Sequence, residues 1–113
     1  MPIQNWSENI LLAELQDDPN FSDDVNALLD QLDSKPDQNV VLDFSSVSFL
    51  NSSNIAKLLK LRKLVGDCGH RLVFCSVAPA TKGIFTVTGL DGVFELADDK
   101  FVALAGLQMV SSE

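Results

Sequence analysis

The segment from Val40 to Leu59 joins an apolar run to a helix-like pattern through a short polar loop, and it constrains the fold more than any other part of the chain. Residues 40–44 are apolar except for Asp43, which predicts a strand that is covered on both faces. Serines dominate the next four positions and end that strand. Apolar residues then return at helical spacing, and we expect them to lie mostly in the core. They are Ile55, Leu58 and Leu59.

Ser52 and Ser53 open the expected helix, which covers about residues 53–65. Serine is a favoured N-cap because its hydroxyl accepts a hydrogen bond from an unpaired backbone N–H of the first turn. The same helix end favours negative charge, since the free N–H groups and the helix dipole point toward it. Two interpretations therefore stay open: the serines only cap the helix, or one of them also accepts a regulatory phosphate.

Strand-like and helix-like patterns alternate along the chain. This order predicts an α/β fold in a single domain that covers residues 1–113, with a core at about 8–108. We expect a mixed, mostly parallel sheet of four to five strands, joined by right-handed crossovers and accompanied by about four helices. The expected strands are 10–15, 40–44, 71–76 and 93–96, preceded by a short edge strand at 3–6. The expected helices cover about 21–32, 53–65, 78–88 and 101–107; Ser22, Pro79 and the pair Asp98 and Asp99 mark three of their starts, and residues 110–113 form a tail.

The size and composition suit a small domain that needs neither a metal nor a disulfide. The chain has 113 residues, of which 46% are hydrophobic, enough to bury a substantial core. No apolar run is long enough to cross a bilayer, and the first residues lack the basic and apolar regions of a secretory signal. The two cysteines, Cys68 and Cys75, are expected to be reduced thiols. We therefore expect a cytoplasmic protein without membrane insertion.

The charge distribution narrows the choice of partner. The formal net charge of −8 argues against direct contact with nucleic acid, which requires a basic surface. Half of the basic residues nevertheless lie on the helix that follows the serines. They are Lys57, Lys60, Arg62 and Lys63. This cluster is either a solvated helix face or a docking face for an acidic partner.

The residues needed for catalysis are missing from the sequence. His70 is the single histidine, so a His-based metal site has no support, and its position between glycine and strand predicts a surface turn residue. The glycines are scattered and form no phosphate-binding loop. Asp43 is expected to brace the following loop, because a pairing of Asp43 with Ser52 lacks a base that could activate the hydroxyl. We expect neither enzymatic activity nor a cofactor.

Three segments together resemble the STAS domain family, and within it the bacterial anti-sigma factor antagonists. In the first, residues 40–59, the strand and loop are followed by Asn-Ser-Ser-Asn at 51–54, which is similar to the family's Asp-Ser-(Ser/Thr)-Gly switch. Residues 69–85 resemble the strand and helix after the switch, and residues 88–96 resemble the turn into the last strand. The resemblance covers roughly residues 8–108 and implies a STAS-like fold.

The resemblance also implies a partner switch. In this family, an anti-sigma factor that is also a serine kinase phosphorylates the antagonist on the serine after the aspartate. The unphosphorylated antagonist binds that kinase and thereby frees a sigma factor. A phosphatase removes the phosphate and resets the system. By position the acceptor is Ser52, with Ser53 as the second choice. The residues expected to contact the partner are Ser48, Asn51, Ser52, Ser53, Asn54, Lys57 and Lys60, and either Phe49 or Leu50 is expected to be partly exposed beside them.

Two positions depart from the family pattern. Asn51 stands in place of the aspartate, which removes a charge beside the acceptor, and Asn54 stands in place of the glycine, which removes a residue that permits close backbone approach. A second function therefore stays open: an interaction module that is not phosphorylated, such as a stress-signalling scaffold or a transporter-associated adaptor.

Overall fold

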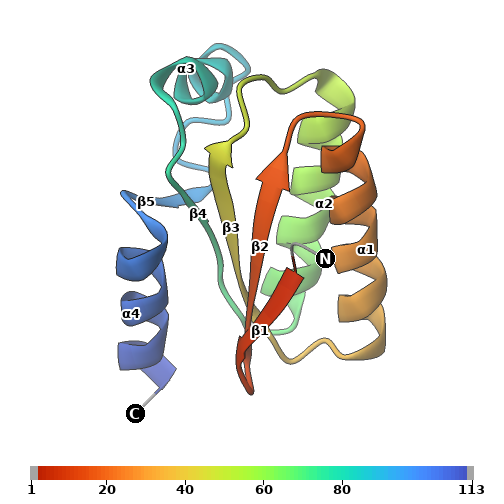
Figure 1. The fold of residues 1–113 in the computed structure, drawn as a ribbon, viewed down its shortest axis with the longest axis vertical. Coiled ribbons are helices and arrows are strands. Elements are labelled where there is room, and N and C mark those ends of the chain that lie inside the picture. The colour runs from red at the N-terminus through yellow and green to blue at the C-terminus, as the bar shows by residue number, and fades with distance from the viewer. Residues whose placement is uncertain (1–2, 112–113) are drawn as a thin grey trace.

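The computed structural model describes residues 3–111, and its centre is a five-stranded sheet in the order β1-β2-β3-β4-β5. Strand β1 pairs with β2 in antiparallel orientation, and every other neighbouring pair is parallel (Figure 1). This confirms the predicted mixed, mostly parallel sheet. The strands are β1 (Ile3–Ser7), β2 (Ile10–Gln16), β3 (Asn39–Ser46), β4 (Leu72–Cys75) and β5 (Glu95–Ala97).

Four helices within the described residues cover the sheet unequally. They are α1 (Asn20–Ser34), α2 (Ser52–Asp67), α3 (Pro79–Val87) and α4 (Lys100–Ser111). Helices α1 and α2 pack side by side on one face, α4 covers the other face, and α3 lies beyond the carboxyl ends of the strands (Figure 1). Right-handed crossovers between strands added in chain order place successive helices on the same face, which explains the α1–α2 pair. The starts of α1 and α2 consequently lie together at the carboxyl end of the sheet.

Two apolar cores lie on opposite faces of the sheet. The larger core, between the sheet and helices α1 and α2, contains a series of neighbouring aromatic rings: Phe21, Phe44, Phe74, Phe85 and Phe94. The smaller core lies under α4, where Val41 and Cys75 of the sheet pack with Leu104 and Leu107. Because β3 contributes alternate residues to both cores, its nearly continuous apolar run is explained.

The structure corrects several of the expected element boundaries; among the strands, β3 continues to Ser46, and β5 begins at Glu95, two residues later than expected. Helix α1 begins at Asn20, so Ser22 lies inside its first turn, and the cap-like acceptor is Asp18, whose Oδ1 accepts a hydrogen bond from the Ser22 backbone N–H at 3.0 Å. The predicted tail at 110–113 is also wrong in part, because α4 continues to Ser111; residues 112 and 113 lie outside the described residues. Pro79 begins α3 as expected.

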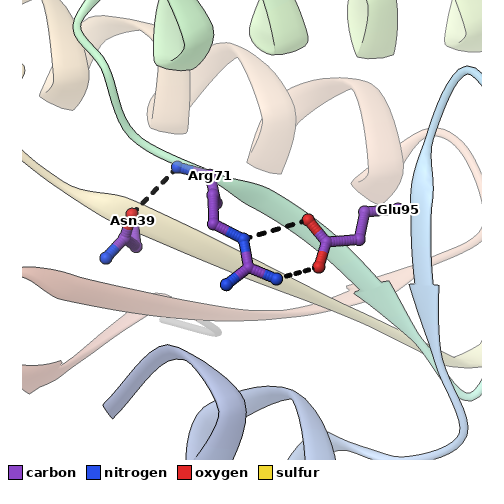
Figure 2. A network of polar contacts seen from close by, with 3 residues as sticks. All are labelled: Asn39, Arg71 and Glu95. Atoms are coloured by element: carbon purple, nitrogen blue, oxygen red, sulfur yellow. Dashed lines mark hydrogen bonds and ion pairs between the residues drawn. The ribbon is translucent and has the colours of Figure 1, made fainter. Parts of the chain in front are cut away.

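Polar contacts connect three neighbouring strands at their amino ends (Figure 2). The Arg71 backbone N–H donates to Asn39 Oδ1 at 2.9 Å, and its guanidinium forms an ion pair with Glu95, with Nε to Oε1 at 3.1 Å. Asn39 begins β3, Arg71 directly precedes β4, and Glu95 begins β5. The contacts thus fasten the short edge strand β5 to the centre of the sheet.

Candidate functional site at the start of helix α2

The loop from Val47 to Asn51 connects β3 to α2 at the carboxyl end of the sheet. Val47 and Leu50 are buried and anchor the loop to the larger core. Between them, Ser48 is exposed and the Phe49 side chain is 62% exposed. The expectation that one of Phe49 and Leu50 is exposed is therefore confirmed, and the exposed residue is Phe49.

Asn51, and neither of the serines, is the N-cap of α2. Its Oδ1 accepts a hydrogen bond from the Asn54 backbone N–H at 2.8 Å, while Asn54 Oδ1 accepts one from the Asn51 backbone N–H at 3.0 Å. This reciprocal capping box satisfies two N–H groups that the helix itself leaves unpaired. The predicted cap at Ser52 or Ser53 is therefore wrong, because the helix begins at Ser52.

The two serines are left free for other roles. Ser52 and Ser53 occupy the first two positions of α2, and both are exposed. Over residues 3–111, neither hydroxyl takes part in a hydrogen bond. Both hydroxyls stand at the positive end of the helix dipole, where added negative charge is favoured.

Asp18, from the loop between β2 and α1, binds both asparagines of the capping box. Its Oδ2 accepts from Asn51 Nδ2 at 3.2 Å and from Asn54 Nδ2 at 2.9 Å. Its Oδ1 accepts from the Ser22 hydroxyl at 2.7 Å in addition to the backbone N–H described above. One carboxylate therefore joins the starts of α1 and α2. It also places a negative charge beside position 51, where the family's aspartate is missing.

Asp17, the preceding residue, holds the exposed half of the loop. Its Oδ1 accepts from the backbone N–H groups of Ser48 at 2.8 Å and Phe49 at 3.3 Å, and its Oδ2 accepts from the Ser48 hydroxyl at 2.6 Å. We call the pair Asp17 and Asp18 the aspartate latch. Together the two side chains fix the 47–51 loop to the β2–α1 loop.

The latch carboxylates are held in their charged form. Hydrogen bonds from Ser22 and then Asn54 lower the pKa of Asp18 to about 2, and hydrogen bonds from Ser48 lower the pKa of Asp17. Bonds donated to a carboxylate stabilise its ionised state, which explains both directions. Asp17 and Asp18 therefore place two full negative charges beside the 47–51 loop at neutral pH.

The predicted site residues fall into two groups in the structure. Ser48, Asn51, Ser52 and Ser53 are exposed together around the loop and the start of α2, and Lys57 and Lys60 follow along the same helix, half-buried and exposed respectively. Asn54 does not join them on the surface, because its side chain is 2% exposed and directed to Asp18. Asn54 supports the start of α2 through its hydrogen bonds, but it offers little surface to a partner.

The apolar residues of α2 need a similar correction. Leu58 is fully buried and Ile55 is half-buried, as expected of core residues, but Leu59 is 37% exposed. Leu59 follows Ser52 by seven residues, or about two turns, so both belong to the solvent side of the helix. The exposed side of α2 thus carries an apolar residue among its lysines.

Asp17 and Asp18 contact the loop, but the sequence analysis gave no role to the residues between the expected strand 10–15 and the expected helix 21–32. A signal for them was present. Strand β2 pairs in parallel with β3, with Gln16 beside Ser46, so the residues that follow the two strands meet at one edge of the sheet. Two acids directly after β2 could therefore have been placed beside the serine loop.

Asp43 and a surface hollow lie outside the loop. Asp43 Oδ1 accepts from the Ser45 backbone N–H at 2.9 Å, which is a bond within β3, so the expected brace to the following loop is not found among the described residues. Within residues 3–111, no group of three or more His, Cys, Asp or Glu side chains is arranged to hold a metal, and no helix is long and apolar enough to span a membrane. A hollow of about 550 Å³ lies at the far end of α2 from Ser52, between His70 and the Arg71–Glu95 ion pair.

The sequence of this chain matches one known domain family over most of its length. Residues 12–101 match the family model of the STAS domain, and the chain belongs to the STAS domain family. Among curated relatives, an anti-sigma F factor antagonist of Paenibacillus polymyxa is 26% identical over 95 residues, which cover 83% of this chain and 81% of that protein.

Solved structures agree on the fold. RsbS of Moorella thermoacetica superposes with a TM-score of 0.83 at 18% identity, covering 99% of this chain and 97% of that one. A chain from the stressosome, described as a signal integration and transduction hub, gives 0.77 at 19% identity, covering 99% and 100%. The phosphorylated form of the Bacillus cell fate determinant SpoIIAA gives 0.65 at 15% identity, covering 87% and 91%.

Proposed function

We propose that this protein is an anti-sigma factor antagonist that binds an anti-sigma factor with serine kinase activity and is switched off by phosphorylation of Ser52. Ser53 is the second candidate acceptor. The observation that carries the proposal is the exposed Ser52 hydroxyl, free of hydrogen bonds within residues 3–111, at the first position of α2. The similarity to an anti-sigma F factor antagonist and to the phosphorylated form of SpoIIAA supports it. The protein would act by binding, without catalysis of its own.

The surroundings of Ser52 explain how a phosphate would act. A phosphate adds roughly −1.5 to −2 charges at neutral pH. On Ser52 it would stand close to the charged aspartate latch, whose Asp18 already occupies the amides of Asn51 and Asn54. The helix dipole favours the phosphate in the free protein, but in the complex the phosphate would repel acidic groups of the partner and would have to be desolvated at the centre of the contact surface. Both effects weaken binding.

The proposed contact surface consists of exposed residues around the acceptor. The loop and the start of α2 supply polar groups from Ser48, Asn51, Ser52 and Ser53. Farther along α2, Lys57 and Lys60 would meet acidic residues of the partner. A phosphatase would restore the binding-competent state. The net charge of −8 agrees with a protein partner and disfavours direct binding of nucleic acid.

The first test is the intact mass of the protein after incubation with ATP and the anti-sigma-type kinases of its own cell, followed by peptide mapping. We expect one added phosphate on Ser52 and none in Ser52→Ala, with Ser53→Ala as the matched control that is still modified. A phosphate on Ser53 alone would mean that Ser53, and not Ser52, is the acceptor. No addition with any such kinase, by a folded protein, would contradict the switch.

A second test measures binding to the kinase. We expect Ser52→Asp to weaken binding, because it introduces a charge beside the latch, whereas Ser52→Ala should bind like the wild type and escape regulation. Equal affinities of the two variants would count strongly against the switch.

A second candidate function is a constitutive interaction module in a larger signalling assembly. The similarity to a chain of the stressosome favours it, and so does the asparagine pair at 51 and 54, which caps α2 without any need for modification. Absence of phosphorylation, combined with stable capture of the chain in a large complex, would support this function in place of the switch.

A further inference from the structure

Phe49 is a large apolar side chain that the fold leaves exposed beside the proposed switch. Its ring is 62% exposed, three residues before Ser52. Exposed apolar residues are common singly, but Phe49 has an apolar companion in Leu59 on the solvent side of α2, and Ala56, one turn after Ser52, is exposed between them. Ser52 thus follows an exposed aromatic residue by three positions and shares its face of α2 with two exposed apolar residues, Ala56 and Leu59.

The exposure of Phe49 is built into the loop. On either side, Val47 and Leu50 are buried in the larger core, and between them the backbone N–H groups of Ser48 and Phe49 are bound by Asp17. The loop is thus fixed at three points around the ring. A change of backbone conformation that turned Phe49 inward would break the Asp17 bonds or withdraw Val47 or Leu50 from the larger core.

We infer that Phe49 is the apolar anchor by which this protein engages the kinase-type partner, entering an apolar pocket whose rim is acidic, and that Asp17 is its positioning residue. The inference rests on the proposed function. Interfaces depend on a few aromatic anchors near their centre, and an anchor that is already rigid loses little conformational entropy on binding. The acidic rim follows from charge complementarity with Lys57 and Lys60 on the adjacent helix.

The test is calorimetric titration of the full chain with the kinase that modifies it. Phe49→Ala should weaken binding by at least about tenfold, as expected of an anchor, while the melting temperature stays close to that of the wild type because the ring is exposed. Phe101→Ala is the matched control: that ring is 67% exposed but lies on α4, on the opposite face of the sheet, and its removal should not change the affinity. An affinity of Phe49→Ala within about twofold of the wild type would overturn the inference.

A double-mutant cycle tests the role of Asp17. Asp17→Ala removes all three bonds to Ser48 and Phe49 and should weaken binding, whereas Asp17→Asn retains an Oδ1 acceptor for the backbone N–H groups and should restore much of the affinity. In the Phe49→Ala background, Asp17→Ala should cost little more, because the anchor is already gone. Fully additive losses would contradict the positioning role.

The two proposals fail in different ways. If Ser52→Asp weakens binding and Phe49→Ala does not, the anchor is wrong and the switch stands. If Phe49→Ala weakens binding and Ser52→Asp does not, the switch is wrong and the anchor stands. If the wild-type chain binds none of the anti-sigma-type kinases of its cell, both proposals are overturned.

Discussion

At the scale of single residues, the site depends on side-chain amides where hydroxyls were expected. Asn51 and Asn54 each contribute an oxygen to the capping box and an Nδ2 group to Asp18. A serine hydroxyl donates and accepts at one oxygen close to the backbone, whereas the asparagine amide has its acceptor and its donor on two separate atoms. The amides therefore cap α2 and bind the latch at once, and the serines remain free.

The latch makes the stability of the protein depend on acid. The pKa of Asp18 in the folded protein is about 2, below its ordinary value of 3.8, so its contribution to stability is complete above about pH 4 and disappears as the pH falls toward 2. We expect the difference in unfolding free energy between wild type and Asp18→Asn to narrow as the pH is lowered from about 6 to about 3. Urea unfolding at several pH values measures it.

A suitable control for the acid effect is Asp33→Asn. Asp33 is an exposed carboxylate of α1 that accepts no hydrogen bond within residues 3–111. Its substitution should leave the pH dependence of stability as in the wild type. If Asp18→Asn and Asp33→Asn have the same pH profile, the latch contributes nothing specific.

Sequence reasoning predicted the positions of the loop and of the helix start better than the hydrogen bonds made there. The loop, the helix start and the exposure of one apolar residue could be predicted because they depend on local pattern. The choice of cap could not, because asparagine and serine are about equally good caps and stand next to each other at 51 and 52. The aspartate latch is a contact between residues more than 30 positions apart, and the local pattern around residues 16–20 says only that a turn is present.

At the scale of elements, helix α2 has a buried side and a solvent side, and adjacent residues can fall on different sides. Leu58 and Leu59 are adjacent in sequence, yet the first is fully buried and the second is 37% exposed. Successive residues of a helix point about 100° apart, so a spacing pattern locates an apolar face only to within one residue. Only the packing of α2 against α1 and β4 determines where its buried face ends.

This division can be measured by two neighbouring substitutions. Leu58→Ala should lower the free energy of unfolding by about 2–5 kcal/mol, because it leaves a cavity in the larger core. Leu59→Ala should lower it by less than about 1 kcal/mol, because water already reaches that side chain. Chemical denaturation gives both values. Similar losses for the two variants would mean that α2 is rotated relative to the described arrangement.

At the scale of the whole molecule, the alternating pattern of strands and helices was sufficient to predict the fold class. Short right-handed connections explain why the strands lie side by side in chain order. The unequal covering of the two faces could not be predicted in the same way, because it depends on α4 crossing to the opposite side after the last strand (Figure 1). Among the side chains that the structure describes, the smaller core under α4 has fewer members than the larger core, so we expect this helix to open more readily than α1 or α2.

The two cysteines provide a measurement of that opening. Cys75 is completely buried under α4, and burial raises the pKa of its thiol to about 12, whereas Cys68 lies half-buried just after α2. Reactive thiolate is therefore scarce at Cys75 in the native state. At about pH 8, a thiol reagent should modify Cys68 first and Cys75 only when α4 opens.

Loosening α4 should accelerate modification of Cys75 alone. Leu104→Ala removes a buried side chain from the smaller core and should raise the rate at Cys75 by about tenfold or more, while the rate at Cys68 serves as the internal reference. Peptide mass spectrometry follows both sites. Equal rates at the two cysteines of the wild type, or an unchanged rate at Cys75 in the variant, would exclude an independent opening of α4.

The two edges of the sheet limit how this protein can meet others. An unpaired strand edge can recruit a strand from another chain, but short length and charged side chains suppress this. Strand β5 has three residues, and its Glu95 is engaged by Arg71; β1 has five residues and exposes Gln4 and Asn5. Neither edge offers a long template for strand addition. The contact proposed above, at the loops and helix starts at the carboxyl end of the sheet, uses neither edge.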